Sequence, residues 1–244
     1  MKRPNRIAPA AGPLPGEGET GDFPLSPGQR ALWFLHRLAP ESPAYHLAGA
    51  VRVAGDVDEE SLALALAELT ARHPALRTVF VEQDDRPVQR VLAEGTVRLE
   101  TMTLDGKTDP AAAATRWAEA PFDLEAGPLF RLALVPGAGG ETQLWFALHH
   151  LVADFTSVAV LLRDLGALYA RRRGLPAPEL PPLPLTTTDV ARWQGEQDFH
   201  EAEEFWRRRL GPAPPVLELP TDRPRPAARR FAGSTHTHRL PAAT

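Results

Sequence analysis

The stretch Gln143-Leu144-Trp145-Phe146-Ala147-Leu148-His149-His150-Leu151-Val152-Ala153-Asp154-Phe155-Thr156-Ser157 decides the fold. Its first six residues form a bulky, continuous apolar run, which indicates a central strand buried on both faces. Asp154 or Thr156 is expected to cap a following helix. The adjacent histidines therefore fall at a strand-to-helix corner, where a rigid scaffold can present side chains to a cavity. The helix is predicted from apolar residues at spacings of three and four, namely Val158, Leu161, Leu162, Leu165, Leu168 and Tyr169.

Further elements are predicted outward from this corner. Ser26 can cap a helix with Pro27 at its first position and Gln29 completing a capping box, and this helix continues with Leu32, Leu35 and Leu38 facing a core. A hairpin with a longer turn is expected at residues 83–87. Other strands are predicted over residues 45–53, 77–81, 88–91, 97–103 and 129–135, and other helices over 58–72 and 109–120, from Thr188 or Asp189, and over 198–210.

Composition bounds the class of protein. The chain has 244 residues, of which 43% are hydrophobic and 24% charged, as expected for a globular chain with a sizeable core. A net charge of -4 gives no general reason to expect a nucleic-acid partner. The absence of Cys excludes disulfides, thiolate metal ligands and a cysteine nucleophile. No apolar run approaches the roughly 20 residues that span a bilayer, so we expect a cytoplasmic protein with no membrane partner.

Several separated motifs resemble those of one family, the condensation domains of nonribosomal peptide synthetases. Residues 26–33, SPGQRALW, look like its first motif, and residues 72–80, RHPALRTVF, resemble its second. Residues 149–154, HHLVAD, match its catalytic HHxxxD motif, and residues 189–193, DVARW, are similar to its fourth. The four motifs occur in the family's order but cover only the amino-terminal half of its pattern.

The resemblance implies an α/β fold of the α+β type, in which a mixed sheet flanked by helices forms one chloramphenicol-acetyltransferase-like lobe. Residues 1–22, rich in Pro and Gly, are then a flexible tail, residues 23–210 the amino-terminal lobe, and residues 211–244 a linker, with a strand-like segment at 233–240, leading towards a missing second lobe. The expected partners are that lobe and donor and acceptor carrier proteins. No metal or bound cofactor is implied, because the carriers supply the phosphopantetheine.

The implied reaction is attack by an acceptor amine on a carrier-bound acyl or peptidyl thioester, which forms an amide bond. An α-amine with a pKa near 7.7 to 8.0 is already partly neutral at pH 7, so the enzyme mainly has to hold it and accept a proton. His150 is the expected catalytic residue, with either a base or a positioning role. The resemblance makes Arg77 an organiser, gives Asp154 a structural ion pair, and leaves His149 to hold the corner through hydrogen bonds.

Phe155 departs from the family pattern, which has Gly at this position. A phenylalanine brings a large side chain and resists a positive φ, so it either reshapes the substrate tunnel or marks a site that has lost activity. The rival function is therefore a non-catalytic lobe that docks carriers or acts as a scaffold. An ester-forming or otherwise divergent member also stays open. A metal site that joins His149, His150 and Asp154 to His236 and His238 is disfavoured, because no zinc motif accompanies these residues.

Overall fold

The computed structural model describes residues 20–104, 108–137, 141–213 and 217–224. The strand-like segment predicted at 233–240 and most of the predicted tail lie outside these residues. The chain divides into two compact units, and in the sequence the division falls between Gln197 and Asp198. Helix α6 (His200–Leu210) lies in the second unit. The first unit contains the candidate site.

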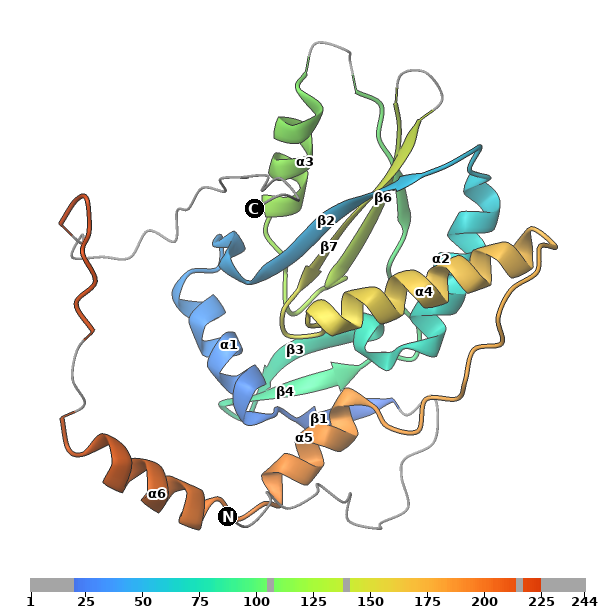
Figure 1. The fold of residues 1–244 in the computed structure, drawn as a ribbon. Helices are drawn as coiled ribbons and strands as arrows, with labels where there is room; N and C mark the ends of the chain where they lie inside the picture. Colours follow the sequence, from blue (N-terminus) through green and yellow to red (C-terminus); the bar gives the residue numbers. More distant parts are fainter. Residues whose placement is uncertain (1–19, 105–107, 138–140, 214–216, 225–244) are drawn as a thin grey trace, which may run out of the picture. The chain divides into compact units, whose positions relative to one another are not determined.

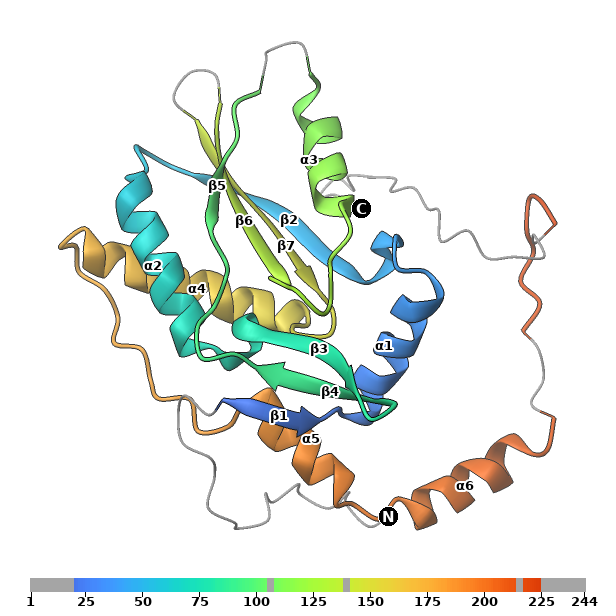
Figure 2. The same ribbon diagram turned by 180° about the vertical axis from the view of Figure 1, so that it is seen from behind.

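A four-stranded mixed sheet forms the centre of the first unit (Figures 1 and 2). Its strand order is β2 (His46–Val53), β7 (Thr142–His149), β6 (Phe130–Pro136) and β5 (Leu99–Thr101). β7 runs antiparallel to both of its neighbours, whereas β5 lies parallel to β6. The prediction that the histidine-bearing strand is central is therefore confirmed.

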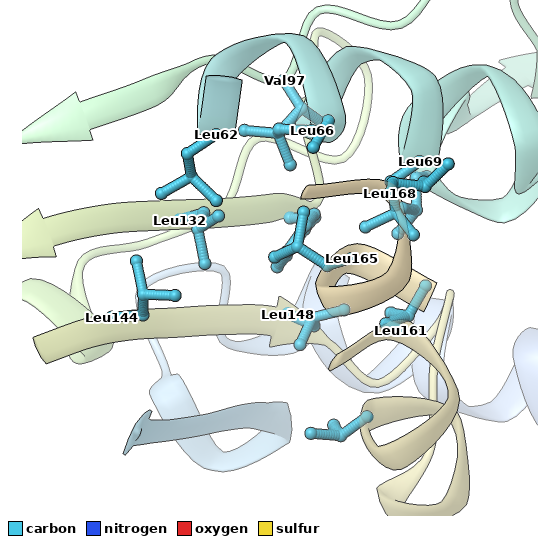
Figure 3. Packing of buried hydrophobic residues seen from close by; sticks show 14 of the residues in the cluster. Leu62, Leu66, Leu69, Val97, Leu132, Leu144, Leu148, Leu161, Leu165 and Leu168 are labelled. Atoms are coloured by element: carbon cyan, nitrogen blue, oxygen red, sulfur yellow. The ribbon is translucent and has the colours of Figure 1, made fainter. Parts of the chain in front are cut away.

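Helices cover both faces of this sheet. α2 (Glu59–Arg72) and α4 (Phe155–Arg172) pack on one face, and α3 (Pro110–Glu119) contacts the other (Figure 1). Because side chains alternate along a strand, Leu144 and Leu148 of β7 enter the leucine-rich core under α2 and α4, while Trp145 faces α3. Figure 3 shows leucines of both helices meeting those of β6 and β7. Full burial of each such side chain contributes about 1.5–3 kcal/mol.

A second, three-stranded antiparallel sheet has the order β1 (Gly21–Pro24), β4 (Arg86–Val91) and β3 (Thr78–Gln83). The sequence gave no prediction of β1. The β3–β4 turn is also tighter than predicted, because Asp84 and Asp85 alone separate the paired residues Gln83 and Arg86. Both aspartates have positive φ, 50° and 59°, a conformation that Asp tolerates better than most residues.

Two helices flank the amino-terminal end of α4. α1 (Pro27–Leu38) begins at the predicted Ser26–Gln29 capping box, but Leu38 is 67% exposed and does not face a core as predicted. α5 (Thr187–Gly195) is capped by Thr186 rather than by Thr188 or Asp189. The expected α/β fold with a mixed sheet and flanking helices is confirmed. Within the described ranges, no helix has the length and apolar character needed to cross a membrane.

Candidate active site

The two histidines lie at the end of β7 and face different surroundings. His149 is the last strand residue and is buried, whereas His150 begins the following turn and is exposed. The backbone N–H of His150 donates to the Tyr45 carbonyl at 2.8 Å, and the Val152 N–H donates to the His149 carbonyl at 3.1 Å. These bonds form a tight turn that leaves the His150 side chain at the surface.

His149 acts within the turn as a buried hydrogen-bond acceptor. Its ring is 1% exposed, and its Nδ1 accepts the Leu151 N–H at 3.1 Å, so the ring proton of the neutral form sits on Nε2. The rings of His36 and His46 lie 5.5 and 6.0 Å away, centroid to centroid. Burial, aided by the neighbouring imidazoles, lowers the pKa of His149 to about 3. This geometry is compatible with the expected corner-holding role, which stays a prediction.

Asp154 caps α4. Its carboxylate accepts both the backbone N–H and the hydroxyl of Ser157 at 2.7 Å, and the Ser157 hydroxyl in turn accepts the Asp154 N–H at 3.1 Å. The Ser157 hydrogen bonds lower the pKa of Asp154, so the carboxylate is ionised at neutral pH. Of the two predicted caps, the structure uses Asp154.

The ion pair expected for Asp154 is absent from the described part of the chain. Ser157 satisfies the Asp154 carboxylate instead. Arg77 is 5% exposed and donates through Nη1 to the Leu92 carbonyl, which holds the loop that follows β4. Burial lowers the pKa of Arg77. The structure thus joins Arg77 and Asp154 by neither a hydrogen bond nor an ion pair.

Phe155 occupies the first position of α4, and its backbone is unstrained. Among the described non-glycine residues only Asp84 and Asp85 have positive φ, so the expected dihedral penalty at Phe155 does not apply. Its side chain is 84% exposed. The departure from Gly therefore changes the surface beside the histidines and leaves the path of the backbone intact.

His150 lines a surface cleft of about 550 Å³ between α1, the histidine turn and α5. Asp154 also lines it, whereas Arg77 and Phe155 do not. A second, smaller cavity of about 350 Å³ adjoins the cleft, shares Asp154 and Ser157 with it, and extends to His73. The cleft is lined by Ser26, Gly28, Gln29, Leu32, His150, Leu151, Val152, Ala153, Asp154, Ser157, Leu185, Thr186, Thr187, Val190 and Gln194.

Sequence reasoning missed two groups of residues at this site. Gln29, expected only as a helix cap, also donates to the Leu151 carbonyl and to buried Gln89. His36 and His46 surround His149. The capping box and the resemblance of residues 26–33 to the family's first motif were the sequence signals for Gln29, and nothing in the spacing of the three histidines indicated that they would meet.

The site can accept a proton at a surface imidazole that stands beside a cleft. His150 supplies this imidazole, while the low pKa of His149 keeps the second ring neutral over the physiological range. The two histidines are therefore not equivalent, and only His150 reaches the cleft. His236 and His238, considered as metal ligands, lie outside the described residues.

Comparisons with known proteins agree on one family. The family described as Condensation domain matches residues 19–244. Phosphinothricin tripeptide synthetase PhsC of Streptomyces viridochromogenes is 39% identical over 252 residues, which is 97% of this chain but 23% of that protein. The chain thus spans less than a quarter of that relative.

Solved structures that resemble this chain are also found. The X-domain from teicoplanin biosynthesis is 36% identical with a TM-score of 0.71 over 84% of this chain and 46% of its own, and the same X-domain has been solved in a complex with OxyB. The starter condensation domain of the rhizomide synthetase RzmA is 23% identical with a TM-score of 0.66, over 81% of this chain and 51% of its own, and shows a shared fold. The chain therefore corresponds to about half of each of these structures.

Proposed function

The chain belongs to the condensation-domain family, and on this premise we propose that it supplies one wall of an acyl-transfer centre in nonribosomal peptide synthesis. The reaction joins a carrier-bound acyl or peptidyl thioester to an amine. The observation that carries the proposal is the position of His150, whose imidazole lies on the cleft while His149 is buried and neutral.

The proposed step needs one proton acceptor. The acceptor amine attacks the thioester carbonyl, and a C–N bond forms as the nitrogen loses a proton. His150 takes this proton or holds the amine in place for its loss, and the C–S bond then breaks so that the thiolate leaves with a proton as a free thiol. The products are an amide on the acceptor carrier and a free pantetheine thiol on the donor carrier. General-base action of this kind typically contributes about 10² to 10⁴-fold.

The proposed partners follow from the open cleft and from the length of the similar structures. The cleft lies on the surface of the first unit, and the chain spans 46% of the X-domain structure and 51% of the RzmA starter domain. We place a second lobe opposite the cleft, with donor and acceptor carriers inserting their phosphopantetheine arms between the two walls. The phosphopantetheine is thus part of the substrates and is not a resident group of this chain.

The test is carrier-to-carrier acyl transfer by the intact synthetase that contains this lobe. We expect His150→Ala to slow amide formation about 10² to 10⁴-fold, with both carriers loaded and amide formation measured directly. His200→Ala is the matched control, because this exposed histidine lies in the second unit. Equal rates for His150→Ala and the unaltered protein would remove the catalytic proposal. Replacing the acceptor amine by a hydroxyl separates amide formation from the ester-forming alternative.

A second candidate is a non-catalytic docking lobe. It is favoured by the 84% exposed Phe155 beside the histidine turn and by the neighbouring structure in which the X-domain is bound to OxyB. Exposed aromatic side chains are enriched where proteins bind one another. On this reading, Phe155 contacts a partner protein instead of shaping a substrate tunnel.

A further inference from the structure

The carbonyl of Leu151, one residue after His150, is held by a side chain from a distant part of the chain. Gln29 Nε2 lies 3.2 Å from this carbonyl oxygen, and Gln29 belongs to the first turn of α1. Leu151 and Val152 both donate back to His149, through its Nδ1 and its carbonyl. The peptide group held by Gln29 is therefore the one whose N–H closes the histidine turn.

The orientation of the Gln29 amide is set by backbone groups at both of its ends. The Ser26 N–H needs an acceptor, which is Gln29 Oε1 at 2.9 Å, and the Leu151 carbonyl needs a donor, which is Gln29 Nε2. The same nitrogen also donates to Gln89 Oε1 at 3.2 Å. Gln89 is fully buried and donates to the Pro24 carbonyl at 2.8 Å. The Gln29 amide thus uses both of its hydrogens and its oxygen.

These bonds connect three separate parts of the lobe. They run from the strand that carries Gln89, through the start of α1, to the turn after β7. Gln29 and His150 also line the same cleft, on α1 and on the turn respectively. A shift of α1 relative to the central sheet would therefore also move the Leu151 carbonyl group, which is one residue away from His150.

We propose that Gln29 is a positioning residue for His150. One of its amide hydrogens fixes the Leu151 carbonyl, and through it the His150 turn, to the amino terminus of α1. The role rests on the proposed acyl transfer and deepens it. A displacement of about 1 Å in a reacting group can cost about 10²-fold in rate, so a single hydrogen bond at this point has a measurable effect.

Gln29→Glu separates this positioning role from helix capping. A glutamate at the third helical position still accepts the Ser26 N–H, completes a capping box and suits the helix dipole. Its carboxylate has no hydrogen to donate, so it faces the Leu151 carbonyl and Gln89 Oε1 as a third acceptor. Asp58→Ala is the matched control, because it removes the cap of α2, whose carboxylate accepts the Ser61 N–H at 2.7 Å, away from the cleft.

The experiment measures carrier-to-carrier amide formation and urea unfolding for Gln29→Glu, Gln29→Ala, Asp58→Ala and His150→Ala in the intact synthetase. We expect both Gln29 variants to lower kcat by about 10 to 100-fold with KM for the loaded carriers within about twofold, whereas Asp58→Ala lowers stability and leaves kcat unchanged. If Gln29→Glu keeps the unaltered kcat while His150→Ala is impaired, the positioning role is wrong and the proposed function survives. If His150→Ala retains full activity, the proposed function itself fails.

Discussion

At the residue scale, His149 is buried and His150 is exposed because the strand ends in a turn between them. β7 points His149 to the interior, beside His36 and His46, and the turn sends His150 to the surface. A local sequence pattern, the continuous apolar run over residues 143–148 followed by helical spacing, predicted that the pair would sit at a strand-to-helix corner, and the structure places the pair there. The pattern gave no information on which further side chains would surround His149, because His36 and His46 come from separate elements whose packing no local pattern specifies.

The buried His149 predicts a loss of stability in acid. Its pKa is about 3 in the folded state against 6.5 in the unfolded chain, so below pH 6.5 the unfolded state binds a proton that the folded state does not. The free energy of unfolding should therefore fall by about 1.4 kcal/mol per pH unit from this group, or about 2 kcal/mol between pH 6.5 and 5. Urea unfolding at a series of pH values measures this slope.

His149→Asn supplies the control for that slope. The asparagine oxygen can accept the Leu151 N–H in place of Nδ1 but does not titrate, so the variant should be less stable at pH 7 and less sensitive to acid. His36, His46 and His73 also have pKa values lowered chiefly by burial, and they contribute to the sensitivity that remains. An identical slope in both proteins would show that His149 is not the group responsible.

A buried charged residue is a second feature of this kind that the sequence did not predict. Asp164 is fully buried on α4 and accepts hydrogen bonds from Arg72, His73 and Arg163. Burial alone would raise the pKa of Asp164, but these three donors outweigh it and lower the pKa. An aspartate on the apolar face of a helix gives no sequence signal about its partners, which here come largely from the end of α2.

At the element scale, prediction from sequence succeeded for the long helices with a regular apolar stripe. It was less accurate at turns and short strands. The capping boxes and apolar stripes placed α1, α2 and α4 within a few residues. The hairpin at Asp84 and Asp85 was predicted, but with too long a turn, because neither residue requires a positive φ, and β1 was missed because four residues are too few to show a period. β5 is also shorter than the strand predicted over residues 97–103, because only Leu99–Thr101 pairs with β6.

Gly95, in the loop that joins β4 to β5, has no room for a larger side chain. A Cβ added at Gly95 would lie 2.0 Å from the Thr70 methyl carbon and 3.5 Å from Arg77 Cβ. Thr70 is buried and its hydroxyl donates to the Leu66 carbonyl, so its side chain cannot rotate away freely. Gly95→Ala should therefore lower the free energy of unfolding by about 1–3 kcal/mol through overpacking.

Gly166→Ala is the matched comparison for this loop variant. Gly166 lies inside α4 with no atom within 4 Å of an added Cβ, so alanine there should stabilise the helix by about 1 kcal/mol. Urea unfolding of both variants gives the two values. A neutral Gly95→Ala would mean that the loop moves away from Thr70 at little cost, and that Arg77 is held less firmly than its contacts indicate.

At the scale of the whole molecule, the lobe has a well-packed interior, and the cleft that carries His150 opens at its surface. Three apolar clusters fill the space around the two sheets, and every one of their residues precedes the second unit. The cleft that carries His150 is a surface feature, which suits a reaction centre completed by a second wall. The half-site itself stays a prediction from the motif resemblance, because composition and periodicity report only on how the lobe buries its own residues.

Phe155 decides between the catalytic and docking functions of the assembled protein. Because its backbone is unstrained and its side chain 84% exposed, Phe155→Gly should lower the free energy of unfolding by no more than about 1 kcal/mol, so changes in activity report on the side chain itself. We expect the unaltered intact synthetase to form the amide, and Phe155→Gly and Phe155→Ala to remain active with an altered preference among donor acyl groups. Phe34→Ala, which removes a 58% exposed phenylalanine from α1 instead of from the helix that follows the histidine turn, should leave that preference unchanged. Amide formation that occurs only after Phe155 is replaced would establish the unaltered lobe as non-catalytic and favour its docking role.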